Sequence, residues 1–373
     1  MLVSQQQTVI LVGAGHAHLH VAAHAEALVK CGARVVLVDP TEFWYSGLAT
    51  GMLGGMYEPE ADQIDPRPLI EARGGEFIQD RVESVDSCAR QLHLDGGGVL
   101  AFDYVSINVG SRVDESAILG ADNDPSVWSV KPVANLWKLR EYLEARFCER
   151  KILRVAVVGG GPTGSEVTAN LTALAGCYDI DLRVTLITNN DRLIPEAPAG
   201  AARALQRKLT KRGVVIRTHT HIVRREGESL IAEDGRVFEA DVVVLALGLE
   251  AHPLVYKTGL PTHPKNGLRI NAMLHSIDDE RVFAAGDCAA MEGFNLPKLG
   301  VFGVRQAAYI HANLLASLDS KPLATYEPQK RYLAILNLGD GTALSTWGPF
   351  WWNGSSSMWL KHWIDHRFLK QYR

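Results

Sequence analysis

The pattern of apolar and polar residues along the chain predicts two copies of one local arrangement. An apolar, β-branched run at residues 8–12 is followed by a glycine-rich turn, a helical pattern and a second apolar run at residues 34–38. The same order of strand, glycine turn, helix and strand recurs at residues 152–188. Strands that alternate with helices predict a parallel sheet covered by helices, so we expect an α/β fold with two such units.

Later patterns add two strands and two helices. An apolar run at residues 241–245 closes on Gly248, and another at residues 281–285 closes on Gly286 and Asp287. Helical patterns cover residues 304–318 and the stretch from Ser357 onward. We expect the two strands to end the two units.

The first glycine turn carries the residues expected of a pyrophosphate site. Gly13 makes the tight turn, Gly15 lets the backbone approach the anion, and the helix that follows offers free N–H groups. Asp39 lies about 20 residues further on, where a carboxylate can accept hydrogen bonds from both ribose hydroxyls of an adenosine. The third position of the pattern is His18 instead of Gly or Ala, which puts close packing of helix against strand in doubt there.

The second glycine turn has all three glycines, Gly159, Gly161 and Gly164. No acidic residue occupies its ribose position, and Arg192 is near enough to contact a 2′-phosphate. The sequence therefore leaves NADH and NADPH both open, with a weak preference for NADH.

A strand that closes on Gly-Asp suits a carboxylate reaching a ribityl or phosphate-linked hydroxyl, with Gly286 allowing close approach of Asp287. The alternative is a simple β-turn with a capping Asp. Two dinucleotides held in one chain most often exchange electrons, so we expect an oxidoreductase.

Composition removes several other functions. A net charge of −4 gives no basic field for nucleic acid, and no apolar run approaches the roughly 18 residues of a membrane span. Without a secretory pattern at the N-terminus, the expected compartment is the cytoplasm. Five scattered cysteines argue against a disulfide framework or a zinc site. The spacing of His16, His20 and His24 permits metal ligation, but a helix that begins at a pyrophosphate rarely also holds a metal, so we predict none.

On these residues the sequence resembles the two-dinucleotide-binding flavoproteins of the pyridine nucleotide–disulfide oxidoreductase superfamily. The Gly-x-Gly turn with Asp39, the Gly-Gly-Gly-Pro-Thr-Gly-Ser-Glu turn at 159–166 and the Phe-Ala-Ala-Gly-Asp-Cys segment at 283–288 come in the family's order, over about residues 8–330. The resemblance implies that the first turn binds FAD, that the second binds NAD(P)H, and that Asp287 holds the ribityl chain of the flavin.

The resemblance also implies a domain division and a set of cofactor ligands. We expect an FAD-binding domain in two parts, 1–125 and 266–328, an NAD(P)H-binding domain inserted at 126–265, and a C-terminal segment with an amphipathic helix at 329–373. The predicted cofactor-binding residues are Gly13, Gly15, His16, Ala17, His18, Asp39, Gly110, Gly159, Gly161, Pro162, Thr163, Gly164, Gly248, Gly286 and Asp287.

Within the superfamily, the Pro-Thr-Gly-x-Glu version of the second turn resembles type II NADH dehydrogenases, which pass electrons from NADH through FAD to a membrane quinone. The first turn and the segment at 297–306 look closer to a bacterial branch sometimes fused ahead of selenide, water dikinase. Disulfide reductases of the superfamily carry a redox cysteine shortly after the first unit, where this chain reads Phe-Trp-Tyr-Ser-Gly-Leu at 43–48. Thiol chemistry is therefore disfavoured.

Three residues are the candidate catalytic groups. The resemblance places Glu166 beside the nicotinamide and the flavin, with a favourable first-turn carboxylate as the alternative. Lys298 could bond the flavin edge and stabilise its reduced anion, or it could be a solvated loop lysine. Gln306, with Arg305, is expected to begin the late helix and to line an acceptor pocket. Tyr45 and its neighbour Trp44 could flank the flavin ring, but packing is the commoner outcome for such residues.

The C-terminal stretch is rich in aromatic and basic residues. Five of the eight tryptophans lie there: Trp347, Trp351, Trp352, Trp359 and Trp363. Lys361, Arg367, Lys370 and Arg373 against Asp365 give the predicted helix a positive charge. This composition suits a helix at a membrane interface, and equally one docked on the flavin domain or on a twin subunit in a homodimer.

Together the sequence predicts an FAD-dependent NAD(P)H dehydrogenase that reduces a quinone, in the cytoplasm or peripheral on the inner face of the cell membrane. One alternative is a soluble flavin reductase whose acceptor is a selenium or sulfur species, oxygen or a carrier protein. Another is a redox-sensing flavoprotein resembling apoptosis-inducing factor.

Overall fold

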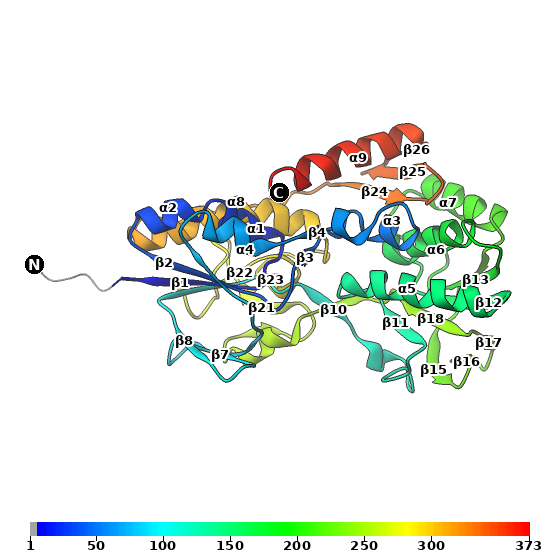
Figure 1. The fold of residues 1–373 in the computed structure, drawn as a ribbon, viewed down its shortest axis with the longest axis horizontal. Helices are drawn as coiled ribbons and strands as arrows, with labels where there is room; N and C mark the ends of the chain where they lie inside the picture. Colours follow the sequence, from blue (N-terminus) through cyan, green and yellow to red (C-terminus); the bar gives the residue numbers. More distant parts are fainter. Residues whose placement is uncertain (1–5) are drawn as a thin grey trace, which may run out of the picture.

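The structure is a computed structural model that describes residues 6–373. Two parallel five-stranded sheets lie toward opposite ends of the long axis (Figure 1). The first sheet has the order β22 (Val282–Ala284), β9 (Tyr104–Ile107), β1 (Thr8–Val12), β2 (Arg34–Val38), β5 (Glu76–Ile78). The second has the order β11 (Val127–Ser129), β18 (Val242–Leu245), β12 (Ile152–Val158), β13 (Asp181–Ile187), β14 (Val215–Arg217). The predicted α/β fold class with two such units is confirmed.

The central strands of both sheets are apolar because other elements pack against both of their faces. In β1 and β2 all residues but the first are buried, and β18 is buried throughout. The covering helices follow the glycine turns directly: α1 (His16–Ala23) after β1, and α6 (Pro162–Ala175) after β12. Both turns therefore lie at the carboxyl ends of central strands, where parallel sheets of this kind bind ligands.

The remaining elements complete the two units. The helices are α2 (Ala25–Lys30), α3 (Ala49–Leu53), α4 (Pro66–Glu71), α5 (Ala134–Glu149), α7 (Ala199–Lys211) and α8 (Gly300–Leu318), with short 3₁₀ turns at Pro59–Ala61, Glu115–Ala117, Pro253–Lys257 and Gly286–Cys288. Two antiparallel three-stranded sheets are β6 (Val82–Asp86), β7 (Gln91–Leu94), β8 (Val99–Ala101), and β15 (Ile222–Glu226), β16 (Ser229–Ala232), β17 (Val237–Glu239). Smaller sheets are β3 (Phe43–Trp44) with β4 (Gln63–Ile64), β10 (Ser111–Val113) with β19 (Leu249–Ala251), and β20 (Thr262–His263), β21 (Gly267–Ile270), β23 (Ala289–Met291).

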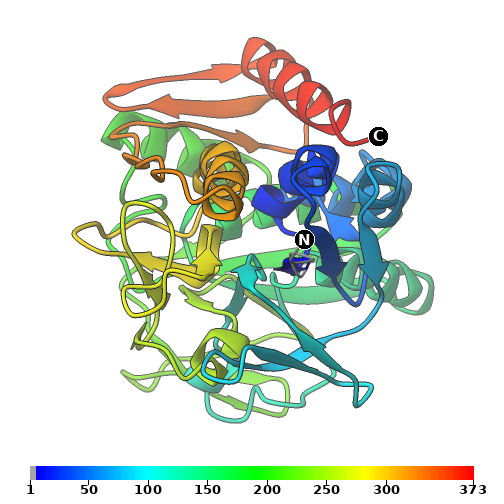
Figure 2. The same ribbon diagram turned by 90° about the vertical axis from the view of Figure 1, so that its left-hand side faces the viewer.

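The C-terminal stretch forms a sheet as well as the predicted helix. Strands β24 (Leu333–Asn337), β25 (Ala343–Trp347) and β26 (Phe350–Gly354) are antiparallel, and α9 (Ser355–Leu369) follows them. Helix α9 lies over one side of this sheet, and α7 lies on the other (Figures 1 and 2).

This segment bridges the two units. Leu336 and Leu344 belong to the hydrophobic core of the second unit. Phe368 and Leu369 of α9 pack in a small core with Leu19 of α1. The C-terminal stretch therefore joins the dinucleotide-binding units on the side that α9 covers.

The late helix begins earlier than its sequence pattern indicates. Helix α8 starts at Gly300, so the prediction that Arg305 and Gln306 begin it is wrong, and both lie in its second turn. Glycine is a poor helix former, so helix propensity does not indicate the first turn, which begins at Gly300. A Cβ on Gly303 would make an ordinary van der Waals contact, 3.6 Å, with the Cα of Gly286.

Among residues 6–373, no helix is long and apolar enough to cross a membrane. The proposed domain boundaries at 125, 265 and 328 remain predictions, and residues 1–5 of the first domain lie outside the described residues. Strand β22 belongs to the first sheet, as expected if residues 266–328 return to the first domain.

Candidate functional site

The first glycine turn connects β1 to α1 in a sharply bent conformation. Gly13 has a φ of 83°, which favours glycine, and its N–H donates to the carbonyl of Val38 at 2.9 Å. A Cβ added to Gly13 would lie 2.8 Å from the carbonyl oxygen of Asn108, and one added to Gly15 would collide with the Asn108 side chain. Only glycine fits at both positions.

Asn108, which follows β9, is a residue that sequence reasoning missed. Its side-chain oxygen accepts the N–H groups of Ala17 at 3.0 Å and His18 at 3.4 Å, in the first turn of α1. Its side-chain nitrogen donates to the carbonyl of Ala285 at 2.6 Å, and its backbone carbonyl accepts from Gly15 at 3.2 Å. Asn108 thus links the first glycine turn to the Gly-Asp turn, two segments far apart in sequence.

His18 replaces the third glycine of the pattern with a buried imidazole. Its Nδ1 lies 2.6 Å from the carbonyl oxygen of Gly13, and its Nε2 lies 2.8 Å from the Ser106 hydroxyl. Because a carbonyl only accepts, Nδ1 carries the proton and Nε2 accepts from Ser106. Burial lowers the His18 pKa to about 4, so the ring is neutral. These contacts, instead of close glycine packing, hold the helix against the sheet, and a direct contact of His18 with a cofactor stays a prediction.

His16 extends from the first turn of α1 toward the C-terminal segment. Its ring centroid lies 4.9 Å from that of Phe43, 6.0 Å from that of Tyr45 and 5.6 Å from that of Phe368. Burial, and then the nearby charge of Lys131, lower the His16 pKa to about 4. A neutral, aromatic-lined His16 therefore lies where the first unit meets α9.

Asp39 lies at the end of β2, beside the turn, as the fingerprint requires. One carboxylate oxygen accepts the Ala14 N–H at 2.6 Å and the other accepts the Thr41 N–H at 2.9 Å. Burial raises the Asp39 pKa, and these N–H groups act against that rise. The proposed bonds to ribose hydroxyls would use the remaining lone pairs of the same oxygens.

The second glycine turn is closed on one side and open on the other. Gly159 has a φ of 123°, and its N–H donates to the carbonyl of Ile187 at 2.8 Å. A Cβ on Gly164 would collide with the carbonyl of Gly159, so this third glycine permits close packing of α6. A Cβ on Gly161 would meet nothing within 4 Å, and Pro162 and Thr163 after it are exposed. The open side is where a pyrophosphate fits.

The residues after β13 bear on the choice of nicotinamide. Arg192, the candidate for a 2′-phosphate, donates to the backbone carbonyls of Pro195 at 2.6 Å and Ala197 at 3.1 Å. Both bonds use the same terminal nitrogen, so the other donors of the guanidinium remain for a phosphate. The preference for NADH remains a prediction.

The Gly-Asp turn after β22 is fixed by side chains from three other segments. The Ser111 hydroxyl donates to the Asp287 carboxylate at 2.7 Å, and the Gln306 side-chain oxygen accepts the Gly286 N–H at 2.7 Å. The Lys298 ammonium donates to the carbonyls of Asp287 and, at 3.1 Å, Asn266. Lys298 is thus tied to the Gly-Asp turn, and burial lowers its pKa.

Two further predicted glycines lie near these turns. Gly110 precedes Ser111 with a φ of 75°, and Gly248 follows β18; a Cβ on either would meet nothing within 4 Å. Gln306 is buried and faces Gly286, so its contacts support the turn, and its role toward an acceptor stays a prediction.

Glu166 connects the second turn to the C-terminal sheet. Its carboxylate accepts the backbone N–H of Asn337, the last residue of β24, at 2.7 Å. Burial raises the Glu166 pKa, while the charge of Lys361 and the Asn337 N–H lower it. Glu166 is therefore tied to the C-terminal sheet. No acidic residue lies in the first turn of α6, so the alternative of a first-turn carboxylate is wrong.

A buried ion pair lies under α9. The Lys361 ammonium donates to the Asp365 carboxylate at 3.0 Å and to the carbonyl of Gly47 at 2.6 Å. The Tyr45 hydroxyl donates to the other Asp365 oxygen at 2.9 Å, and the Tyr45 ring stacks on Phe368 with centroids 4.5 Å apart. Lys361 counts toward the positive charge predicted for this helix, but its side chain is only 8% exposed and its charge is paired with Asp365. The i, i+4 spacing of Lys361 and Asp365 was a signal for the pair, but not for its burial.

No thiol lies in the segment where disulfide reductases of the superfamily carry a redox cysteine. All five cysteines are free, and residues 43–48, beside the first turn, contain none. Cys288 is buried next to the Gly-Asp turn, and burial raises its pKa to about 11, which leaves it a poor nucleophile.

These features define a two-dinucleotide-binding protein: two parallel sheets, each with a glycine turn that leads from a central strand into a helix. The chain belongs to the pyridine nucleotide-disulphide oxidoreductase family, whose model matches residues 7–309. Membership of this family implies binding of FAD and NAD(P)H. The second glycine turn fits a dinucleotide because the space beside Gly161 is open and Pro162 and Thr163 are exposed.

Among characterised relatives, the chain is 28% identical over 279 residues to the type II NADH:quinone oxidoreductase of Haemophilus influenzae, covering 66% of this chain and 63% of that enzyme. It is 26% identical over 373 residues to the alternative NAD(P)H-ubiquinone oxidoreductase C1 of Arabidopsis thaliana, covering 87% of this chain and 70% of that protein. The chain thus spans less than two thirds of the Haemophilus enzyme.

Among solved structures, NDH2 from Plasmodium falciparum in complex with NADH matches with a TM-score of 0.82 at 16% identity, over 99% of this chain and 98% of that one. The sulfide:quinone oxidoreductase of Aquifex aeolicus matches with a TM-score of 0.83 at 16% identity, over 99% and 92% of the two chains. At this identity the matches establish a shared fold.

Proposed function

We propose that this oxidoreductase transfers electrons from NADH through FAD to a quinone. The observation that carries the proposal is the buried Glu166 carboxylate just after the second glycine turn, where it accepts the Asn337 N–H and where the charge of Lys361 lowers its pKa. The lack of a cysteine at residues 43–48 supports a small diffusible acceptor over a disulfide. The quinone reductases among the relatives support the same choice.

The residues of the chain have positioning and electrostatic roles in this proposal. When bound, the flavin accepts hydride from the nicotinamide and passes the electrons on. The backbone at Gly13 and Gly15 would hold the FAD pyrophosphate, and Gly161 with Pro162 and Thr163 would receive that of NADH. Asp39 would bind the adenosine ribose of FAD.

Two charged groups complete the proposed active site. Asp287 and Lys298, tied to each other at the Gly-Asp turn, would hold the ribityl chain and stabilise negative charge that develops on the flavin edge. Glu166 would position the nicotinamide beside the flavin.

We further propose that the β25–β26 hairpin, with α9 on one side of it and α7 on the other, meets an anionic membrane, where quinones reside. Large aromatic residues are exposed there, including Phe350 at 62%, Trp359 at 70% and Trp363 at 51%. Interfacial binding favours such residues when cationic groups accompany them.

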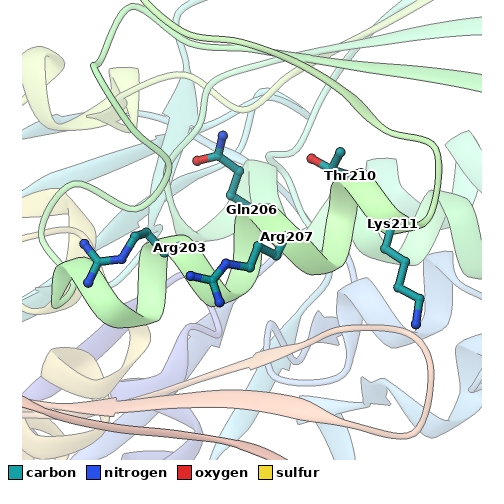
Figure 3. Close-up of a pocket in the computed structure, with 5 residues that line it drawn as sticks. All are labelled: Arg203, Gln206, Arg207, Thr210 and Lys211. Carbon is teal, nitrogen blue, oxygen red and sulfur yellow. The ribbon is translucent and has the colours of Figure 1, made fainter.

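Helix α7, on the other side of the C-terminal sheet, carries the cationic groups. Arg203, Arg207 and Lys211 recur every fourth residue along an exposed face, and they line a shallow hollow of about 550 Å³ (Figure 3). None of the three forms an ion pair with another described residue. Trp351, near the tip of the β25–β26 hairpin, packs against Gly200 at the start of the same helix, so the aromatic and basic groups are neighbours.

Stopped-flow absorbance of the yellow protein tests the electron path. We expect NADH to reduce the flavin faster than NADPH does, and a short-chain quinone to reoxidise it at tens per second or faster. The Glu166→Gln variant should reduce its flavin roughly tenfold more slowly, a loss of about 1.4 kcal/mol of transition-state stabilisation. Glu141→Gln, on the exposed side of α5, is the matched control.

An unchanged rate in the Glu166→Gln variant would refute its assigned role. Fast reduction followed by slow reoxidation by quinone would move the function to a soluble acceptor, such as a selenium or sulfur species, oxygen or a carrier protein. Reduced protein that persists in air together with bound NAD⁺ would indicate a redox sensor.

A further inference from the structure

Asn170 is a fully buried residue of α6, one helical turn after Glu166. Its side-chain nitrogen donates to the backbone carbonyl of Glu166 at 2.9 Å and to the backbone carbonyl of Asn337 at 3.1 Å. Because a carbonyl oxygen only accepts, the amide nitrogen and not the amide oxygen must face these two groups. Glu166 and Asn337 are the same two residues that the Glu166 carboxylate joins by accepting the Asn337 N–H at 2.7 Å. Asn170 therefore closes a ring of hydrogen bonds that includes the Glu166 side chain.

The other end of the Asn170 amide has no hydrogen-bond partner. Its oxygen is buried without a donor among the described residues, and a Cβ on Gly54 would lie 2.6 Å from it. A Cβ on Gly339 would lie 3.2 Å from the same oxygen. An unpartnered buried oxygen costs stability, and an apolar side chain at this position would avoid that cost. What the amide supplies, and an apolar side chain would not, is the bridge from α6 to Asn337.

A second side chain fixes the turn between β24 and β25 to α6. Arg212, which follows α7, donates to the carbonyl of Leu338 and, at 2.9 Å, to the carbonyl of Ala169 on α6. Asn170 and Arg212 thus hold two successive carbonyls of this segment, those of Asn337 and Leu338. The backbone N–H that bonds the carboxylate is thereby held at one place relative to α6.

This arrangement affects both the orientation and the charge of Glu166. Burial raises the Glu166 pKa, and the charge of Lys361 and the Asn337 N–H act against that rise. An ionised carboxylate has more acceptor sites than this one N–H uses, so the bond orients Glu166 and leaves it able to accept from a ligand. Loss of the bond would free the carboxylate to rotate and would favour its protonated form.

We propose that Asn170 is a positioning residue for the reaction with NADH, which acts by holding the Asn337 N–H against the Glu166 carboxylate. Arg212 supports the same contact from α7. The inference rests on the function proposed for Glu166, which is to position the nicotinamide beside the flavin. It does not depend on the acceptor, because NADH reduces the flavin before the acceptor reacts.

Asn170→Ala tests the inference in the flavin-loaded protein, because alanine suits a helix and removes both bonds of the amide. We expect the limiting rate of flavin reduction by NADH to fall about fivefold, less than the loss of about tenfold expected for Glu166→Gln. The NADH concentration that gives half the limiting rate should stay within about twofold of wild type, since the turn at Gly161 is unchanged. The ionised carboxylate is the orienting form, so the rate should rise with pH, and this rise should occur at higher pH in the variant.

A double variant shows whether Asn170 acts through Glu166. In the Glu166→Gln protein, Asn170→Ala should slow reduction by less than about twofold, because the carboxylate that Asn170 positions is already absent. A loss of about fivefold that persists in this background would overturn the inference, since Asn170 would then act by another route.

Asn313→Ala is the matched control. Asn313 is also a fully buried asparagine in a helix, α8, and its side-chain nitrogen bridges the carbonyls of Met273 at 2.7 Å and Ala324 at 3.0 Å. Its replacement should leave the limiting rate and the pH profile unchanged. A slowing equal to that of Asn170→Ala would mean that lost stability, and not the position of Glu166, lowers the rate, and it would overturn the inference.

Hydrogen exchange of the Asn337 amide gives a readout that needs neither NADH nor turnover. We expect this amide to exchange about tenfold faster in Asn170→Ala and in Arg212→Ala than in wild type, and at the wild-type rate in Asn313→Ala. Unchanged exchange and an unchanged reduction rate in Asn170→Ala would overturn the inference. If Asn170→Ala does not fold, the same two measurements on Arg212→Ala decide, and unchanged values there would overturn it.

The proposed function fails by different results. An unchanged reduction rate in Glu166→Gln would refute the role of Glu166, and with it the inference. A flavin that NADH reduces at the expected rate but quinone does not reoxidise would refute the acceptor alone. The measurements on Asn170 would still stand, since they use only the reaction with NADH.

Discussion

At the scale of single residues, His18 and Asn108 show how polar side chains replace backbone contacts at the first glycine turn. His18 fills the place of a glycine and bonds both the turn and the neighbouring strand through Ser106. Asn108 accepts the first N–H groups of α1, as a helix-capping residue would, although it comes from a different strand. Together they connect the turn, the helix and the sheet in one buried hydrogen-bonded set.

Asp62, which precedes β4, has a fully buried carboxyl group that predicts an unusual pH dependence of stability. Burial, and then the like charge of Asp365, raise its pKa to about 8. Below about pH 4 the acid is protonated in both the folded and the unfolded chain and contributes nothing. As pH rises toward the folded-state pKa of about 8, the unfolded chain releases its proton and the folded chain retains it, so folding is progressively destabilised. The free energy of unfolding should therefore fall by up to about 1.4 kcal/mol per pH unit across this window.

Asp62→Asn removes this proton linkage. Its stability relative to wild type should rise between pH 5 and pH 8, as measured by urea unfolding at several pH values. Parallel pH profiles for the two proteins would show that Asp62 has an ordinary pKa in the folded state.

At the scale of elements, the C-terminal segment buries one part of its surface against the protein and exposes another part. Helix α9 buries Lys361, Asp365 and Phe368 and exposes Trp359 and Trp363. The two alternatives that the sequence left open, docking and membrane binding, therefore use different faces of one helix. Docking on the first unit is observed, and membrane binding is the proposal.

Charge reversal on α7 tests the proposed membrane surface. Each basic residue near an anionic bilayer contributes about 1 kcal/mol, so changing Arg203, Arg207 and Lys211 to Glu should weaken binding to vesicles containing phosphatidylserine by more than tenfold. Wild-type binding should also weaken at high salt. Flotation of the full-length proteins measures both effects.

An equal charge change elsewhere is the control. Arg183, Arg224 and Lys257 are exposed and lie on β13, β15 and the 3₁₀ turn after β19. Their replacement by Glu should weaken flotation less than the α7 change does. Equal losses would mean that overall charge, and not the α7 face, controls binding.

At the scale of the whole molecule, the sequence could predict those residues whose structural reasons lie close to them in the chain. Gly13, Gly159 and Gly164 were recognisable because each has a local conformational or packing reason to be glycine. The predicted Asp39 and Asp287 also lie beside their turns, at strand ends.

The residues that reasoning missed act across long distances in the chain. Asn108 contacts segments about 90 residues before it and about 180 after it. Asp62 and Asp365 come together only when α9 docks. The C-terminal sheet was missed because its strands carry exposed tryptophans and lack the alternation of a half-buried strand. The local sequence pattern does not indicate such contacts, since tertiary packing creates them.

The contacts of Asn108 predict how the protein behaves when FAD is removed. The first turn keeps its shape through bonds between protein atoms, so the site is pre-organised and FAD need not create it. Protein stripped of flavin should retain its secondary structure by circular dichroism and take up one FAD on readdition. Asn108→Ala should bind FAD at least tenfold more weakly, because the turn must then be ordered by the ligand. If wild-type apoprotein unfolds instead, the shape of the turn depends on the flavin.

A scaffold that survives without its flavin could be reloaded with flavin analogues of different reduction potential, so that the driving force of the reaction becomes adjustable in a single protein.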